Sequence, residues 1–185
     1  MSLVELIAQA DERGLAASGL ACLDRCVPLL GGDDEALRPL WASLADGSEW
    51  AGSLEKARGA LGSAESGEDE AALLARRMLE AAPADRTAEA VRAWADACSV
   101  ASLRIHRLLD PATDGTSSAD ALEAGRAGGT EDVSPLVAAE LRRQVAVLEL
   151  LAEHGTNGLR GALDVSVEGR RVLRAVVSRR ARGRR

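Results

Sequence analysis

The sequence predicts an all-α fold, either a single helical bundle or stacked helical hairpins, with about seven helices and a basic C-terminal tail. Apolar residues recur at alternating spacings of three and four along most of the chain, which places them on one face of a helix. Capping residues precede several of these segments, and glycine or proline follows them. Only residues 163–168 alternate as a strand does, and a lone strand would leave its backbone groups without partners.

The clearest helix lies between Thr87 and Asp110, and we expect it to be the central element of the fold. Thr87 can cap its start, and Pro111 forces Asp110 away from helical backbone angles, so both ends are defined. The helix is longer than the three turns that are usual in a globular domain. Its apolar stripe consists of Val91, Trp94, Cys98, Ala101, Ile105 and Leu108.

Shorter helices are expected before this one. Ser2 and Glu5 form a capping box for the first helix, which we expect to end near Gly14. Pro28 kinks or ends the second helix, whose apolar face carries Leu20 and Leu23. Acidic residues or turn residues then open three further helices, which are expected over about 33–45, 49–61 and 66–82.

The C-terminal half begins with an irregular stretch over about 111–134, which is either functional or flexible and has room for a short helix near 119–127. Ser134 and Pro135 then start a long helix that ends at Gly155. Residues 158–178 form a helix or include a strand, and a strand would need a partner from another subunit. We favour the helix, and expect residues 1–178 to form one domain and residues 179–185 a disordered, arginine-rich tail.

Charge divides the chain into two parts. Up to Gly169 there are 29 acidic and 15 basic residues, whereas the remaining residues contain eight arginines and no acid. A basic segment of this kind can bind phosphates of nucleic acid or another polyanion. The acidic body would repel nucleic acid, and the segment has no aromatic residues for stacking on bases. The polyanion-binding candidates are Arg170, Arg171, Arg174, Arg179, Arg180, Arg182, Arg184 and Arg185.

Cysteine and histidine provide few candidates for chemistry. Cys22 and Cys26 are four residues apart and share a helix face, but a zinc site needs four ligands and no second pair stands at the required spacing. We therefore expect both to pack in the core. His106 and Asp110 have the same spacing, which suits a general base, although His106 lies at the edge of the apolar stripe and is expected at a boundary or surface. Trp94, Cys98 and His106 are the candidates for a ligand pocket.

The sequence contains no recognised signature of a hydrolase, a metalloprotease or a nucleotide-binding loop. We therefore expect no catalytic, cofactor-binding or metal-binding residues, and an enzyme is the less favoured class. No run of 18 apolar residues and no signal peptide is present, which predicts a cytoplasmic protein without a membrane span. Arginine in place of lysine, with no phenylalanine or tyrosine, is typical of a GC-rich bacterial genome.

These observations favour a non-enzymatic protein that acts by protein–protein interaction or regulation, with a protein partner or self-association. The bipolar charge distribution and a long helical surface suit such contacts. The first alternative is a nucleic-acid-associated regulator that uses the C-terminal arginines. The second is a helical protein or enzyme that binds a small molecule without a recognisable motif.

Overall fold

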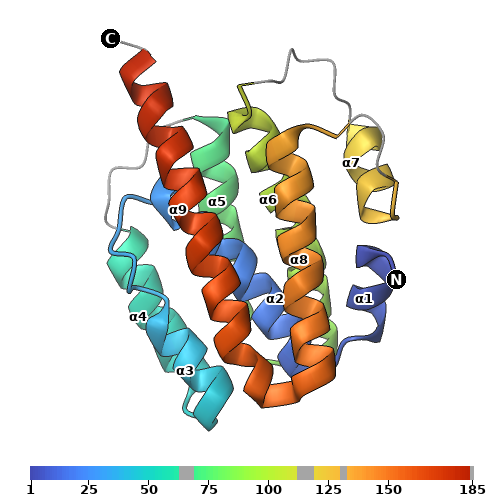
Figure 1. Cartoon of the computed structure of the whole chain (residues 1–185). Helices are drawn as coiled ribbons and strands as arrows, with labels where there is room; N and C mark the ends of the chain where they lie inside the picture. Colours follow the sequence, from blue (N-terminus) through green and yellow to red (C-terminus); the bar gives the residue numbers. More distant parts are fainter. Residues whose placement is uncertain (63–68, 112–118, 130–132, 184–185) are drawn as a thin grey trace.

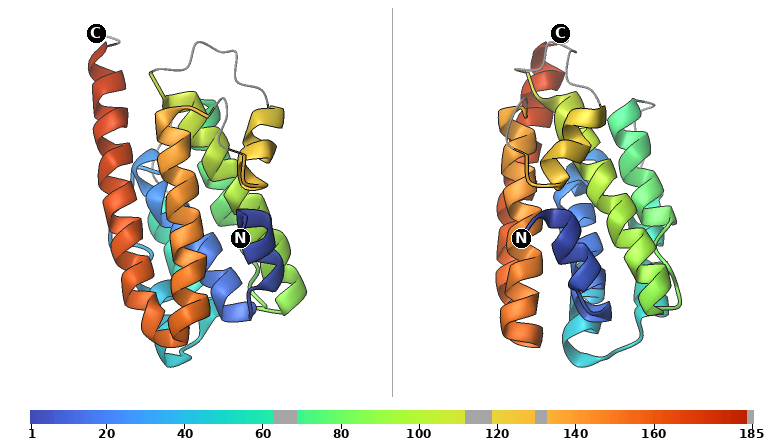
Figure 2. Two further views of the ribbon diagram at one scale, coloured as in Figure 1. Left: turned by 45° about the vertical axis from the view of Figure 1, so that its right-hand side comes forward. Right: turned by 90° about the vertical axis from the view of Figure 1, so that its right-hand side faces the viewer.

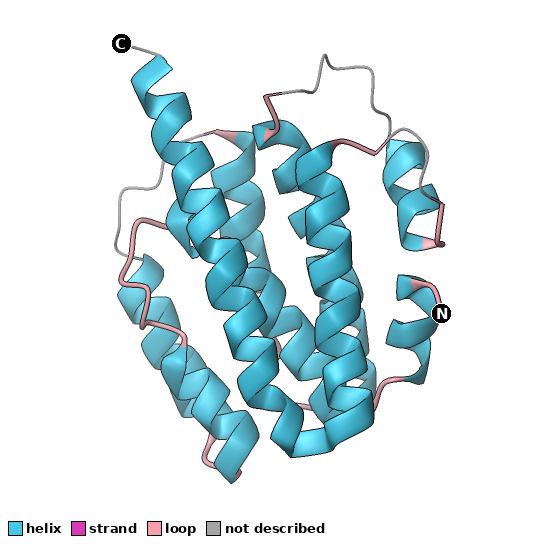
Figure 3. Cartoon of the chain, in the orientation of Figure 1, coloured by secondary structure: helices cyan, strands magenta, loops and turns pink. Residues whose placement is uncertain are grey.

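The structure is a computed structural model that describes residues 1–62, 69–111, 119–129 and 133–183. Those residues contain helices, turns and no strand, so the prediction of an all-α fold is confirmed (Figure 3). The α-helices are α1 Leu3–Gln9, α2 Glu12–Arg25, α3 Arg38–Asp46, α4 Trp50–Gly62, α5 Glu70–Glu80, α6 Ala88–Leu109, α7 Ala119–Arg126, α8 Pro135–His154 and α9 Leu159–Gly183. Short 3-10 helices cover Val27–Leu29 and Gly155–Gly158.

Helix α2, rather than α6, is the centre of the bundle. It packs most extensively on α6 and also on α8 and α9, which surround it (Figures 1 and 2). Every residue from Gly14 to Arg25 is buried. A helix buried on all sides shows no clean apolar stripe, and for this reason α6 is the more conspicuous of the two in the sequence. The two helices meet closely at Gly19, where an added Cβ atom would lie 2.6 Å from the Trp94 ring.

Helix α6 has the ends expected from its sequence. The Thr87 hydroxyl accepts a hydrogen bond from the Ala90 amide at 3.1 Å, and Asp110 is the C-cap. Trp94 donates through Nε1 to the Met78 carbonyl oxygen at 2.9 Å, which ties α6 to α5. The Trp94 ring also meets Trp50 edge-on, with centroids 6.2 Å apart. Two of the three tryptophans therefore hold α4, α5 and α6 together.

The last segment is one continuous helix, α9, so the strand alternative for residues 158–178 is wrong. Its two interior glycines lie at close contacts: a Cβ atom at Gly161 would press on Leu150, and one at Gly169 would clash with Arg25. The helix also continues to Gly183, past the expected start of a disordered tail at residue 179. Its last turns extend beyond the start of α8, which runs antiparallel to it (Figures 1 and 2).

Other boundaries differ in detail. The first helix ends at Gln9 rather than near Gly14, because Asp11 caps α2 by accepting from the Gly14 amide at 2.7 Å. Within the expected irregular stretch, α7 forms where a short helix was expected, while residues 112–118 and 130–132 lie outside the described residues. No helix in the described part of the chain is both long enough and apolar enough to cross a membrane.

Candidate functional site

A buried ion pair between α2 and α8 is the first candidate. Arg25 donates through Nε to Glu140 Oε2 at 2.8 Å and through Nη2 to Glu140 Oε1 at 2.7 Å. Both side chains are fully buried. Two parallel hydrogen bonds of this kind are the strongest geometry available to an arginine and a carboxylate. The pair therefore fixes α8 against the central helix.

Further polar side chains complete this buried polar cluster. Glu140 Oε1 also accepts from the Ser102 hydroxyl at 2.8 Å and from Gln144 Nε2 at 2.9 Å. Ser99 donates to Gln144 Oε1 at 2.6 Å. Arg126, brought by α7, donates to the Ser99 hydroxyl at 3.2 Å and also pairs with Asp96 and Glu123. The cluster thus runs from the centre of the bundle to α7.

His106 belongs to this cluster, and the expectation that it lies at a boundary or surface is wrong. Its side chain is 1% exposed, with Nε2 3.5 Å from Glu140 Oε2. Its Nδ1 lies 2.7 Å from the Ser102 carbonyl oxygen, which can only accept, so Nδ1 carries the proton. The expected partner, Asp110, accepts from the Leu136 amide at 2.9 Å and so fixes the start of α8.

The charges of the cluster are set by burial and by the ion pair. Burial opposes ionisation of Glu140, but the charge of Arg25, the charge that His106 gains when it is protonated at low pH, and the hydrogen bonds from Arg25 and Gln144 outweigh it and lower the pKa of Glu140 to about 2. Burial lowers the pKa of His106, although the Glu140 carboxylate partly opposes this. At neutral pH the cluster therefore contains an ionised pair beside a neutral imidazole.

The cysteines are packing residues, as expected for Cys22 and Cys26. All three thiols are buried. Burial raises the pKa of Cys22 to about 12, so it is a thiol rather than a thiolate at neutral pH. Among the described residues, no three side chains of His, Cys, Asp or Glu gather as a metal site would require. Neither of the two grooves described below is lined by Arg25, His106 or Glu140.

The predicted pocket residues separate into two places. Trp94 and Cys98 line a groove of about 380 Å³ between α5 and α6, together with Met78 and Ala101. Both are almost entirely buried and form the floor of this groove. His106 lies inside the bundle instead. The small-molecule hypothesis stays a prediction for Trp94 and Cys98.

The C-terminal arginines also fall into two groups. Arg170 and Arg174 hold α9 on the bundle: Arg170 donates to Asp24 Oδ1 at 2.5 Å, and Arg174 pairs with Asp34. Among the C-terminal arginines that the structure describes, Arg171, Arg179, Arg180 and Arg182 are exposed and form no ion pair. Arg184 and Arg185 lie outside the described residues. The nucleic-acid hypothesis stays a prediction, with fewer arginines available to bind phosphate.

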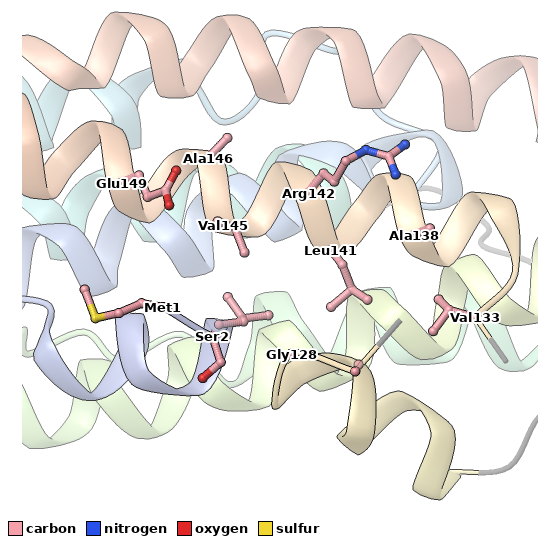
Figure 4. A pocket seen from close by; sticks show the side chains of 13 residues that line it. Met1, Ser2, Gly128, Val133, Ala138, Leu141, Arg142, Val145, Ala146 and Glu149 are labelled. Carbon is pink, nitrogen blue, oxygen red and sulfur yellow. The ribbon is translucent and has the colours of Figure 1, made fainter. Parts of the chain in front are cut away.

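A larger groove, which was not predicted from the sequence, follows the outer face of α8. We call it the α8 groove; it has a volume of about 510 Å³. Its floor on α8 consists of Ala138, Leu141, Arg142, Val145, Ala146 and Glu149. Met1 and Ser2 line the opposite side, and Gly128 and Val133 line one end (Figure 4). Leu141 and Val145 point from α8 into the α8 groove (Figure 4).

The apolar character of the α8 groove extends to its rim. Met1, which lines the groove, is 73% exposed. Val4, which follows the lining residue Leu3 on α1, is 42% exposed. The one other large hydrophobic residue with high exposure in the described chain is Leu73, on α5. Exposed apolar residues that gather beside a concave apolar surface are typical of an interaction site. The helical spacing of Leu141 and Val145 is the one signal of this surface in the sequence, and it equally indicates a core face.

No protein family model, curated protein or solved structure matches this chain.

Proposed function

We propose that this chain is a non-enzymatic interaction protein that binds a helix of a protein partner in the α8 groove. The observation that carries the proposal is the open groove along α8, with the apolar residues Leu141 and Val145 on its floor and the exposed residue Met1 on its opposite side. A groove that presents apolar residues at helical spacing is one of the recurring ways in which proteins bind an amphipathic helix. Burial of that apolar surface supplies the binding free energy.

The buried polar cluster supports the same conclusion. Its ionisable groups, Arg25, Glu140 and His106, are used to fix the helices against one another and are sealed from solvent. A general acid or base must lie within hydrogen-bond reach of its substrate. The side chains of these residues are buried and do not reach the surface. The features left for function are therefore surface features, and the α8 groove is larger than the groove between α5 and α6.

Site-specific photo-crosslinking in the cells that produce the protein tests this proposal. A photoreactive amino acid replaces Ala138 in the groove or, as the matched control, Leu73 on α5, which lies outside it. We expect a discrete protein adduct from position 138 that is absent from position 73, because only the groove is occupied. Val145→Arg should abolish the adduct, since a charged side chain would occupy the apolar floor.

Mass spectrometry of the adduct identifies the partner. Equal labelling at positions 138 and 73, or an adduct that survives Val145→Arg, would contradict the proposal. Circular dichroism of Val145→Arg checks that the helices remain, and little loss is expected because Val145 is only half-buried.

A further inference from the structure

Two opposite charges lie on the floor of the α8 groove and have no partner within the described chain. Arg142 and Glu149 are both exposed, and neither side chain forms an ion pair or hydrogen bond with any described residue. They are seven residues apart, so they lie on the same face of α8, about 10 Å apart along its axis. Val145 and Ala146 lie midway between them.

We propose that the partner is a second copy of this chain, whose α8 lies antiparallel to the first across the groove. The proposal rests on the proposed function and names the occupant of the same site. A two-fold axis that passes between Val145 and Ala146 places Arg142 of each protomer opposite the partner's Glu149. One surface then supplies both halves of a self-complementary interface, as two-fold symmetry requires.

Charge and size select this arrangement. A parallel pairing of the two helices would place Arg142 opposite the partner's Arg142, and like charges in contact are unfavourable. At the axis, Val145 and Ala146 are small enough to let two helices approach closely. Gly128 at one end of the groove also has no side chain that would obstruct a second helix. The exposed residue Met1, which lines the groove, would be covered at the flank.

The charge pattern favours a second copy over an unrelated helix or a small apolar ligand. An apolar ligand would satisfy neither Arg142 nor Glu149. An unrelated helix would need both charges at the opposite positions, whereas a second copy contains them at the correct spacing by identity. The contact between Arg142 of one protomer and Glu149 of the other occurs twice in each dimer, so its effect on affinity is doubled.

Sedimentation equilibrium of the full chain and its charge-exchanged variants tests the inference. We expect a dimer for the wild-type chain. Arg142→Glu and Glu149→Arg should each weaken dimerisation by about tenfold or more, because each places two like-charged contacts at the interface. The variant that carries both substitutions should regain the wild-type dissociation constant, since each exchanged pair is again of opposite charge.

Arg160→Glu is the control, because it makes the same change in net charge as Arg142→Glu at an exposed position at the start of α9. It should leave the dissociation constant unchanged. A monomeric wild-type chain, or a double variant as weak as the single ones, would overturn the inference. A monomer that still gives an adduct with another protein at position 138 would leave the proposed function standing, whereas absence of both results would contradict both proposals.

Discussion

Replacement of Glu140 by alanine is expected to lower the free energy of unfolding by about 3–5 kcal/mol. The carboxylate pairs with Arg25 and accepts hydrogen bonds from Ser102 and Gln144, all in the interior. Its removal leaves the Arg25 guanidinium charged and buried without a counter-ion. Desolvation of an unpaired charge costs more than the ion pair itself contributes. Urea unfolding followed by circular dichroism measures the loss.

Two further variants separate the buried charge from the loss of a side chain. Glu153→Ala removes an exposed carboxylate from the same helix outside the α8 groove and should change stability by less than about 0.5 kcal/mol. Arg25→Met combined with Glu140→Leu removes both charges and keeps apolar volume, so it should be less destabilising than Glu140→Ala alone. A loss below about 1 kcal/mol for Glu140→Ala would contradict the assignment of this pair to the interior.

Acidification is expected to destabilise the protein in two steps. The folded pKa of His106 lies below its ordinary value of 6.5, so the unfolded chain takes up a proton that the folded chain excludes. The contribution of His106 to the free energy of unfolding is therefore fully present above pH 6.5 and decreases as the pH falls below that value. Glu140 has a folded pKa of about 2 against an ordinary value of 4.5. Its contribution, on the order of 3 kcal/mol, is present above pH 4.5 and is lost as the pH falls toward 2.

Unfolding free energies measured from about pH 7.5 to about pH 3 test both steps. His106→Asn should remove the loss between about pH 6.5 and pH 5 while leaving the steeper loss at lower pH. Arg25 and Arg143 also act on the imidazole, and both disfavour its charged form, so they act in the same direction as burial. A loss between about pH 6.5 and pH 5 that His106→Asn leaves unchanged would contradict its assignment to His106.

Local signals predicted the ends of several helices. The capping box of Ser2 and Glu5, the Thr87 cap and the Ser134-Pro135 start all correspond to observed helix ends. The continuity of α9 was harder to predict, because Gly161 and Gly169 weaken a helix in isolation. Close tertiary contacts explain why glycine stands at both positions. Such contacts cannot be deduced from local spacing.

The buried polar cluster was not predicted, because its members are far apart in the sequence. Arg25 and Glu140 are separated by 115 residues. A glutamate in a helix and an arginine near a helix end are both ordinary surface residues, and only the packing of α2 on α8 reveals that they pair. His106 was misplaced for the same reason: the face of α6 on which it lies is covered by α8, beyond the apolar stripe.

The α8 groove was missed because sequence periodicity identifies an apolar face and not what covers it. Leu141 and Val145 are four residues apart and indicate an apolar helix face, and the structure shows that part of α8 remains open beside α1. The spacing of seven between Arg142 and Glu149 is visible in the sequence. This spacing indicates an interface only in combination with the structure, where both residues are exposed and unpaired in the described chain.

The central claim, that a polypeptide covers the α8 groove, is tested most directly by maleimide labelling of Val145→Cys in living cells. Leu73→Cys is the matched control, and the three native thiols are at most 1% exposed, so they should stay unlabelled. We predict that the thiol introduced at position 145 labels slowly in cells and rapidly in dilute purified protein, while the thiol introduced at position 73 labels at similar rates in both. Equal labelling of position 145 in cells and in dilute protein would contradict the claim.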